Sequence, residues 1–280
     1  LLGRMIQRSE VEGVSTWLYD SQDKGIGLLA EVRGPNGYSE SYAYDSLSRP
    51  VKVTYTLDGQ SFVVANSYDA YSRIAKITYP GGFRIRNEYA AQGYLREVRN
   101  DATNALLWRV DRLNARGQVE QARLGNGLLT KQQFDARTGF LQTIETGPSG
   151  APGQVQNLAF AFDAIGNLTS RSDKNQSLTE TFTYDRLNRL LKAQVNTRTA
   201  DTVQYDILGN ITFKSGVGRY TYGGNGVGPH AVTAISGGIS ASFVYDANGN
   251  RIQSNGGSIV YTSFNLPASL VQGSNRIDYA

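Results

Sequence analysis

The sequence predicts an all-β fold in which β-hairpins follow one another along the chain. A short unit of strand, aspartate-led turn and second strand recurs along nearly the whole sequence. Glycine accounts for 31 of 280 residues and charged residues for only 19%, a balance that indicates many turns and few solvated helices. No segment has the strong apolar spacing of an amphipathic helix. Together these observations favour hairpins over helices.

The clearest copy of the unit spans residues 182–191. Phe182 and Tyr184 alternate with threonines, which is the period of a strand with one aromatic face and one polar face. Asp185 follows at the end of the strand, where its carboxylate can bond to the backbone N–H two residues on and start a turn. Asn188 stands where the chain must reverse, and asparagine tolerates the left-handed conformation. Two leucines then begin the returning strand.

The unit recurs as an aromatic residue followed directly by aspartate, at spacings of roughly 21 to 28 residues. The structural repeat motif is found at Tyr44-Asp45, Tyr68-Asp69, Phe134-Asp135, Phe162-Asp163, Tyr184-Asp185, Tyr205-Asp206 and Tyr245-Asp246. Weaker members are Tyr19-Asp20, Tyr89-Ala90 and Val110-Asp111. Four residues beyond the aromatic, where the turn needs positive φ, stand Gly93, Gly166, Gly209 and Gly249, with Ser48, Ser72 and Asn188 as substitutes. The return strands open at Ile74, Leu95, Leu168, Leu190 and Ile211.

In chain order, residues 1–43 hold an irregular first copy, and the regular pattern begins at residue 51. Residues 51–55 and 61–68 alternate as strands around an Asp58-Gly59 hairpin turn. Residues 100–146 also show some helical spacing, but their glycines interrupt it, so strands are expected there. We interpret the Gly/Pro-rich residues 147–153 as a surface loop and residues 1–280 as one continuous array, a fragment of a longer chain.

Composition narrows the class further. The chain has no cysteine, so it contains neither a disulfide framework nor a thiolate metal site. Its net charge is +4, but the positive residues are scattered singly and form no basic stripe of the kind that marks nucleic-acid binding. No apolar run approaches the roughly 18 residues of a membrane helix. We expect neither a nucleic-acid partner nor a membrane span.

A sheet with one aromatic face must cover that face, and without helices it can do so only with more sheet. A barrel, a propeller, a sandwich or a spiral sheet would meet this need. In a stacked array, equivalent tyrosines are expected to lie beside one another as an aromatic ladder.

Several segments resemble the YD repeats of the Rhs (rearrangement hotspot) family. Three of them carry the motif itself, at residues 184–190, 205–211 and 245–252. Gly228-Pro229-His230-Ala231-Val232-Thr233 and Trp17-Leu18-Tyr19-Asp20 are similar to segments of bacterial Rhs cores. The resemblance covers almost the whole chain.

The resemblance implies a long antiparallel sheet that spirals into part of a hollow shell. In bacterial relatives, including insecticidal toxin complexes, that shell encloses a C-terminal toxic domain until delivery. Related repeats occur in wall-associated bacterial proteins and in the extracellular teneurins. The family's shell-closing region carries Asp-Pro motifs and a self-cleavage site, whereas this sequence has no Asp-Pro pair. No catalytic residue is therefore carried over.

Other chemistries were weighed at single positions. The repeated aspartates could pair as acid and base, but their place after each aromatic favours turn capping. Asp246, Asn248 and Asn250 alternate as calcium ligands do, although the glycine comes too early and the distal glutamate is missing. His230, the single histidine, lacks a nearby nucleophile pattern. The sequence thus assigns no catalytic, cofactor-binding or metal-binding residue.

The leading functional prediction is a noncatalytic shell segment of an exported bacterial protein, secreted or at the cell surface. Its expected partners are a C-terminal toxin or effector domain of the same full-length chain and secretion-system or surface components. The alternative is an extracellular adhesion array that recognises glycans or a protein through exposed aromatics. A glycoside-processing enzyme ranks third, because it needs carboxylates converging in one groove.

Overall fold

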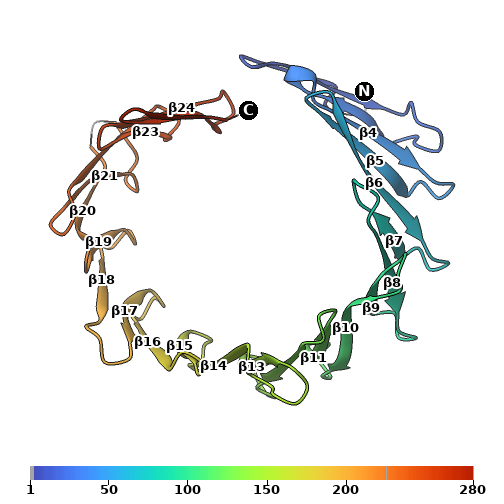
Figure 1. The fold of residues 1–280 in the computed structure, drawn as a ribbon. Helices are drawn as coiled ribbons and strands as arrows, with labels where there is room; N and C mark the ends of the chain where they lie inside the picture. The colour runs from blue at the N-terminus through green and yellow to red at the C-terminus, as the bar shows by residue number, and fades with distance from the viewer. Residues whose placement is uncertain (1–2, 225, 280) are drawn as a thin grey trace. The chain divides into compact units, whose positions relative to one another are not determined.

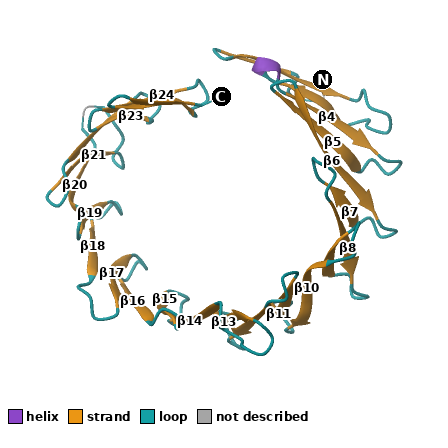
Figure 2. Cartoon of the chain, viewed as in Figure 1, coloured by secondary structure: helices purple, strands orange, loops and turns teal. Residues whose placement is uncertain are grey.

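A computed structural model describes residues 3–224 and 226–279. It confirms the all-β prediction, with 26 strands and, among the described residues, a single helical element, the short 3-10 helix η1 (Pro35–Gly37) (Figure 2). Strands β10 to β13 fill most of residues 100–146, so the helical alternative there is wrong.

The chain divides into two compact units, residues 1–133 with 145–155 and residues 134–144 with 156–280. The first unit contains β1 (Gln7–Glu10), β2 (Gly13–Tyr19), β3 (Leu29–Arg33), β4 (Ser39–Tyr44), β5 (Pro50–Leu57), β6 (Gln60–Tyr68), β7 (Ile74–Thr78), β8 (Arg84–Tyr89), β9 (Leu95–Asn100), β10 (Leu106–Leu113) and β11 (Val119–Leu124). β12 (Leu129–Phe134) and β13 (Leu141–Gly147) contribute residues to both units.

The second unit continues with the same kind of short strand. It contains β14 (Gln156–Phe162), β15 (Leu168–Asp173), β16 (Leu178–Tyr184), β17 (Leu190–Val195), β18 (Asp201–Tyr205), β19 (Ile211–Lys214), β20 (Gly218–Tyr222), β21 (Val232–Ser236), β22 (Ala241–Tyr245), β23 (Arg251–Ser254), β24 (Gly257–Tyr261), β25 (Pro267–Gln272) and β26 (Asn275–Asp278). The return strands β7, β9, β15, β17 and β19 begin at the residues that the sequence pattern predicts.

From β1 to β12 and from β14 to β26, each strand pairs antiparallel with the next strand along the chain. The labelled strands of each unit follow one another in chain order in Figure 1. The main contacts between strands likewise join neighbours in sequence, and η1 additionally contacts β2. Each unit is therefore a meander in which one hairpin packs only against the hairpins before and after it, which is the contact pattern of a repeat protein.

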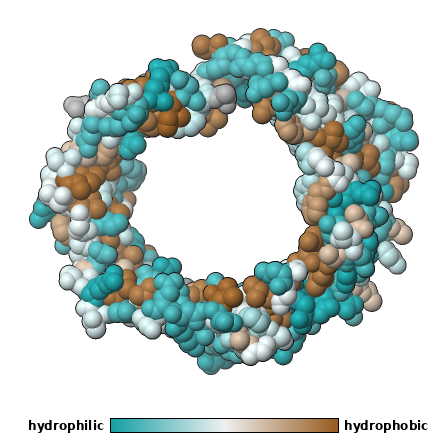
Figure 3. Space-filling model, viewed as in Figure 1, coloured by the Kyte–Doolittle hydropathy of each residue, from teal (hydrophilic) through white to brown (hydrophobic). Residues whose placement is uncertain are grey.

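The sheet buries little. The buried apolar residues are Ala30, Val110, Ala122, Leu129 and Val203, and no large side chain among the described residues is fully buried. Along β16, residues alternate between half-buried and exposed, and Phe182 and Tyr184 lie on the half-buried face. Apolar atoms consequently reach the surface in groups between hydrophilic ones (Figure 3). The aromatic face is only partly covered, in contrast to the expectation that more sheet would cover it.

A β-bulge precedes the aromatic residue of the motif. The register shifts between Thr183 and Tyr184, so that Tyr184 pairs with Leu190, the first residue of the return strand. The same shift occurs at Tyr44, Tyr68, Tyr89, Phe162, Tyr205, Tyr222, Tyr245 and Tyr261. A bulge adds one unpaired residue and increases the local twist, and here it fixes the aromatic ring at the mouth of the turn.

Two detailed expectations are wrong. Val110-Asp111 is not a turn, because both residues lie inside β10; the turn follows at Asn114, whose N–H donates to the carbonyl of Gln118 at 3.0 Å. Motif tyrosines do not stack on one another in a ladder either. The paired rings are Tyr79–Phe83, Phe140–Phe162 and Tyr220–Tyr222, none of which joins two successive motif aromatics.

Candidate functional site in the repeat turn

The aspartate of the motif organises a compact turn. In the copy at residues 184–190, Asp185 Oδ1 accepts the backbone N–H groups of Leu187 at 2.8 Å and Arg189 at 2.9 Å. The Asp185 N–H donates to the Arg189 carbonyl, and the Asn188 N–H donates to the Asp185 carbonyl, both at 3.0 Å. Asn188 has a φ of 61°, which confirms the predicted left-handed position. The carboxylate thus accepts hydrogen bonds from backbone N–H groups that the turn itself would leave without a partner.

The other regular copies keep this geometry. Their aspartates accept the N–H groups two and four residues on, at Asp45, Asp69, Asp163, Asp206 and Asp246. The predicted left-handed residues all have positive φ, at Ser48, Ser72, Gly93, Gly166, Gly209 and Gly249. The repeat motif is therefore one turn built repeatedly.

Sequence reasoning missed a further member of the motif, four residues after the aspartate, which we term the clasp residue. Its side chain donates to the second carboxylate oxygen, at distances of 2.7 to 3.0 Å. The clasp residues are Arg49, Arg73, Asn167, Arg189, Asn210 and Asn250. Arginine follows serine or asparagine at the left-handed position, and asparagine follows glycine. This pairing is visible in the sequence and could have revealed the position.

The clasp residue also reaches the next repeat. The guanidinium groups of Arg49, Arg73 and Arg189 lie over the rings of Tyr68, Tyr89 and Tyr205, at 4.3, 4.1 and 4.6 Å from the ring centroids. The asparagines instead donate across to Asn188 at 3.0 Å, to the Pro229 carbonyl at 3.1 Å and to Asn265 at 2.8 Å. Cation–π contacts of this kind are favourable even at exposed sites. Each turn is thereby tied to its successor.

A second link between repeats passes through the tyrosine hydroxyl. Tyr184 Oη donates to the carbonyl of Leu168, the first residue of the preceding return strand, at 2.8 Å. Seven other tyrosines make the equivalent bond: Tyr44, Tyr68, Tyr89, Tyr205, Tyr222, Tyr245 and Tyr261. Tyr222 and Tyr261 escaped the sequence reading because glycine and threonine follow them instead of aspartate. The motif tyrosine therefore contributes both its ring and its hydroxyl to the structure.

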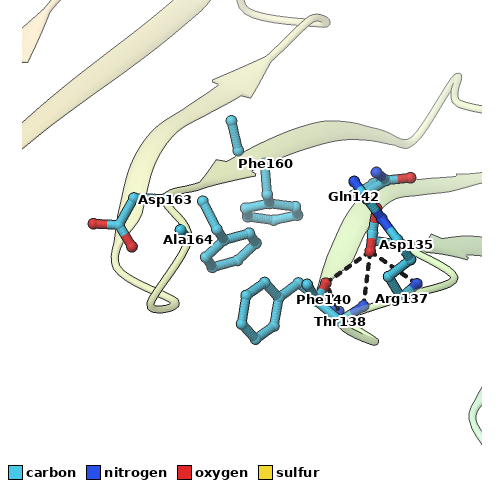
Figure 4. Close-up of a pocket in the computed structure, with 10 residues that line it drawn as sticks. Asp135, Arg137, Thr138, Phe140, Gln142, Phe160, Asp163 and Ala164 are labelled. Carbon is cyan, nitrogen blue, oxygen red and sulfur yellow. Dashed lines mark hydrogen bonds between the residues drawn. The ribbon is translucent and has the colours of Figure 1, made fainter.

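The Phe134 and Phe162 copies depart from this scheme because phenylalanine has no hydroxyl to donate. The turn after Phe134 is one residue longer, and its positive φ falls on Gly139. Phe140 occupies the place of the clasp residue and lies 5.1 Å from Phe162, centroid to centroid. Both rings line a cavity of about 330 Å³ together with Phe160 and Asp135, and Figure 4 shows Phe140 and Phe160 among its lining residues. An apolar ring pair thus replaces the charged clasp at this turn.

The aspartates are held ionised by their partners. The Arg49 side chain, aided by the backbone N–H groups of Arg49 and Leu47, lowers the pKa of Asp45 to about 2. The backbone N–H of Arg189 and its side chain lower the pKa of Asp185, and Asn250 lowers the pKa of Asp246. Carboxylates used in this way serve the turn rather than acid–base chemistry.

We expect the array to lose stability in acid. Unfolded aspartate titrates near pH 3.9, so a folded pKa below that value contributes stability above about pH 4, which is lost as the pH falls toward about 2. Thermal unfolding followed by circular dichroism should show a melting temperature that is level at neutral pH and falls steeply below about pH 4. In Asp45→Asn this fall should be smaller, and a wild-type melting temperature as high at pH 2 as at neutral pH would contradict the interpretation.

Arg189→Ala should weaken its own turn and the following one. It removes the bond to Asp185, the bond to the Asp206 carbonyl and the stack on Tyr205, the last alone typically contributing about 0.5–1 kcal/mol. The matched control is Arg186→Ala, since Arg186 is exposed in the same turn. Chemical denaturation of both variants tests this prediction. Equal denaturation midpoints for Arg189→Ala and Arg186→Ala would show that the clasp residue does not stabilise the array.

The residues considered for other chemistry are placed as follows. Asp246 accepts N–H groups from Asn248 and Asn250 and the side-chain amide of Asn250, so these three residues form a turn. His230 is exposed, and its Nδ1 lies 2.7 Å from Asn210 Oδ1. Because the Asn210 amide donates to Asp206 and Pro229, its oxygen accepts, and Nδ1 carries the proton. No cluster of three or more potential metal ligands occurs in the described ranges.

The sequence and the fold were compared with known protein families and solved structures. Residues 25–60 match the model of the RHS Repeat family. No curated protein matches the sequence. Among solved structures, the chain resembles the Photorhabdus luminescens Tc holotoxin pore, with a TM-score of 0.68 and 16% identity over 98% of this chain and 18% of that one.

Two further solved structures share the fold. The TcdB2–TccC3 crystal structure matches with a TM-score of 0.59 and 14% identity, over 99% of this chain and 20% of that chain. TcdB2–TccC3 without its hypervariable C-terminal region matches with a TM-score of 0.60 and 15% identity over the same shares. The chain thus spans about a fifth of the length of the solved chains that it matches.

The fold and the turn define a class, the β-hairpin repeat array stabilised by linked turns. Residues 25–60 match the RHS Repeat family, and the chain as a whole shares its fold with the Tc toxin chains. Within the part of the chain that the structure describes, no helix has the length and apolar character needed to cross a membrane.

Proposed function

We propose that this chain is a noncatalytic wall segment of an exported bacterial Rhs-type protein, whose shell encloses a C-terminal toxin or effector domain of the same full-length chain. The fold shared with Tc toxin chains over 98–99% of this sequence supports the proposal. One of those structures is of TcdB2–TccC3 without a hypervariable C-terminal region, which is the kind of segment that such a shell would enclose.

The observation that carries the proposal is how the motif's polar groups are used. In the six regular copies, the aspartate bonds within its own turn and the clasp residue bonds or stacks onto the next. Interactions of this kind extend a wall by one hairpin at a time and leave no repeat carboxylate aimed at a substrate. We infer that the two units belong to one continuous array. Of residues 147–153, expected as a surface loop, Gly147 ends β13, so the loop of this proposal begins at Pro148.

Export and assembly complete the proposal. A wall that encloses a toxic domain acts outside the producing cell, so we place the protein at the cell surface or in the medium, with secretion-system or surface components as further partners.

The experiment is protease protection of the full-length chain. A tagged C-terminal domain should resist digestion while the repeat region is folded and become sensitive when mild denaturant opens it. Cryo-EM of the same particle should show density inside a strand-walled cavity. A C-terminal domain digested equally fast in both conditions, or a filled particle, would refute encapsulation.

A second function, adhesion, is favoured by one specific surface. Tyr55, Phe62, Tyr79 and Phe83 remain 36–47% exposed, and Phe62 and Tyr79 line a groove of about 590 Å³ with Pro80. Exposed rings suit stacking on sugars. Glycan-array binding should then fall in Phe62→Ala and persist in the control Tyr71→Ala, which removes an exposed ring outside the groove. Binding that both variants retain would exclude this surface.

A further inference from the structure

Six cations and four carboxylates gather on one face of five neighbouring strands of the first unit, β7 to β11. Lys76 lies directly opposite Arg86, and Arg86 lies directly opposite Arg99. Two residues further along the strands, on the same face, lies a second row. In it Glu88 is opposite Glu97, Glu97 is opposite Arg109, and Arg109 is opposite Arg123. Directly paired residues of an antiparallel sheet share a face, so these side chains form a continuous patch. We term it the charged face, which also includes Arg84, Asp101 and Asp111.

The charged face could not be recognised from the sequence. Its cations are dispersed along residues 76–123, and the row Lys76, Arg86 and Arg99 joins residues 10 and 13 positions apart. The strand register alone brings them into a row, at the spacing of about 4.8 Å that separates neighbouring strands. The premise that the positive residues form no stripe is therefore wrong for the folded chain.

Two carboxylates of the charged face are far more buried than the cations at its edge. The side chains of Asp101 and Glu97 are only 7% and 8% exposed, whereas Lys76 and Arg84 are 46% and 52% exposed. Lys76 Nζ lies 2.9 Å from Asp101 Oδ1, and Arg84 and Arg86 approach the same carboxylate at 3.5 and 3.6 Å. Asp101 and Glu97 thus lie beneath and hold the cations beside them, whereas Glu88, 42% exposed, lies among the cations at the surface. The surface therefore presents fixed positive charge.

The carboxylates of the charged face do not neutralise all of its cations. Three cations surround Asp101, and the face as a whole has two more cations than carboxylates. Like charges directly opposite each other on a sheet are unfavourable, and the row Lys76, Arg86, Arg99 contains two such pairs. An anion placed over the row relieves that repulsion, and the cations are already held in position for it.

We propose that the charged face binds an acidic peptide segment, a stretch rich in aspartate or glutamate, through Lys76, Arg84, Arg86 and Arg99. These cations already bind carboxylates in the structure: Arg86 holds Glu88 at 2.9 Å and Arg99 holds Glu97 at 2.5 Å. An extended peptide presents alternate side chains about 6.8 Å apart on one side, so a short acidic run spans the row. Trp108 pairs with Val98 on the opposite face, so it offers no ring here for stacking nucleic-acid bases.

The test is fluorescence anisotropy of a labelled octaglutamate peptide with the complete chain at low salt. Octaglutamate should bind, and added salt should weaken binding because the contacts are screened. The double variant Lys76→Gln/Arg84→Gln should bind about tenfold more weakly, a loss of about 1.4 kcal/mol. Arg276→Gln is the matched control, since Arg276 is an exposed arginine paired with Asp278 on β26, and it should bind as the wild type does.

A gain of binding gives the sharper readout. Asp101→Asn removes the carboxylate beneath the row and should raise the affinity for octaglutamate several-fold, an effect that a purely structural role for the face would not produce. Circular dichroism verifies that each variant is folded; if Asp101→Asn does not fold, the double variant decides. No binding of octaglutamate by the wild type, equal binding by the double variant, or preferential binding of dextran sulfate through the same residues would each overturn the proposal.

Discussion

Gly218→Ala should be among the most destabilising single substitutions in the chain. Gly218 opens β20 with a φ of +118°, a conformation that residues with a Cβ rarely adopt. An added Cβ would also lie 2.1 Å from the Ser236 carbonyl oxygen, inside the pairing of β20 with β21. Strain and overlap together should cost about 3 kcal/mol or more. Urea unfolding followed by circular dichroism would measure the loss.

Gly216→Ala is the matched control, two residues earlier. Gly216 also has positive φ, +75°, but nothing lies within 4 Å of an added Cβ. Only the left-handed penalty of about 1–2 kcal/mol then applies. If the two variants lose the same free energy of unfolding, the close approach of the Ser236 carbonyl does not contribute to the loss. The pairing of β20 with β21 must then adjust to accept the added Cβ.

The features that were predictable from sequence are local ones. The motif is an aromatic residue followed by aspartate, with a residue that tolerates positive φ three positions after the aspartate. It determines where the strand ends, where the turn forms and where the chain reverses, all within one short segment. Asn188 and Gly209 therefore lie in the left-handed region, and Leu190 and Ile211 begin strands, as expected. Val110-Asp111 misled because Asn114 stands four residues beyond Val110, as in the regular copies, yet Asn114 opens the turn instead of ending it and the positive φ falls on Gly117. Asp111 instead pairs with Arg109 at 2.6 Å within the strand.

What the sequence could not reveal depends on register and on contacts between repeats. The pairing of β16 with β15 brings the Tyr184 hydroxyl to the Leu168 carbonyl, and no local pattern specifies a carbonyl 16 residues away. The clasp of Arg189 over Tyr205 likewise requires the next repeat to be in place. At Tyr68, Tyr89 and Tyr205 the expected tyrosine ladder fails for this reason, because an arginine lies beside the ring where a second tyrosine was expected.

Tyr184→Ala should destabilise its own repeat and the preceding return strand. The ring is half-buried, not fully buried, so the loss should be about 2–3 kcal/mol, below the 3–5 kcal/mol usual for a buried aromatic. Tyr184→Phe separates the two contributions, since it keeps the ring and removes only the bond to Leu168, for about 0.5–1.5 kcal/mol. Hydrogen exchange on each variant would locate the loss along the chain.

The spread of that loss tests the linked-turn account itself. If each hairpin is stabilised by its neighbours, exchange in Tyr184→Phe should quicken in β15 and β16 together, because the lost bond joins Tyr184 to the start of β15. Phe162 provides a natural reference, since that copy already lacks the hydroxyl, and Phe162→Tyr should leave exchange there unchanged or slower. Faster exchange confined to β16 would mean that the hydroxyl bonds do not couple neighbouring repeats. Coupling between repeats would then come from the strand pairing and the clasp residues alone.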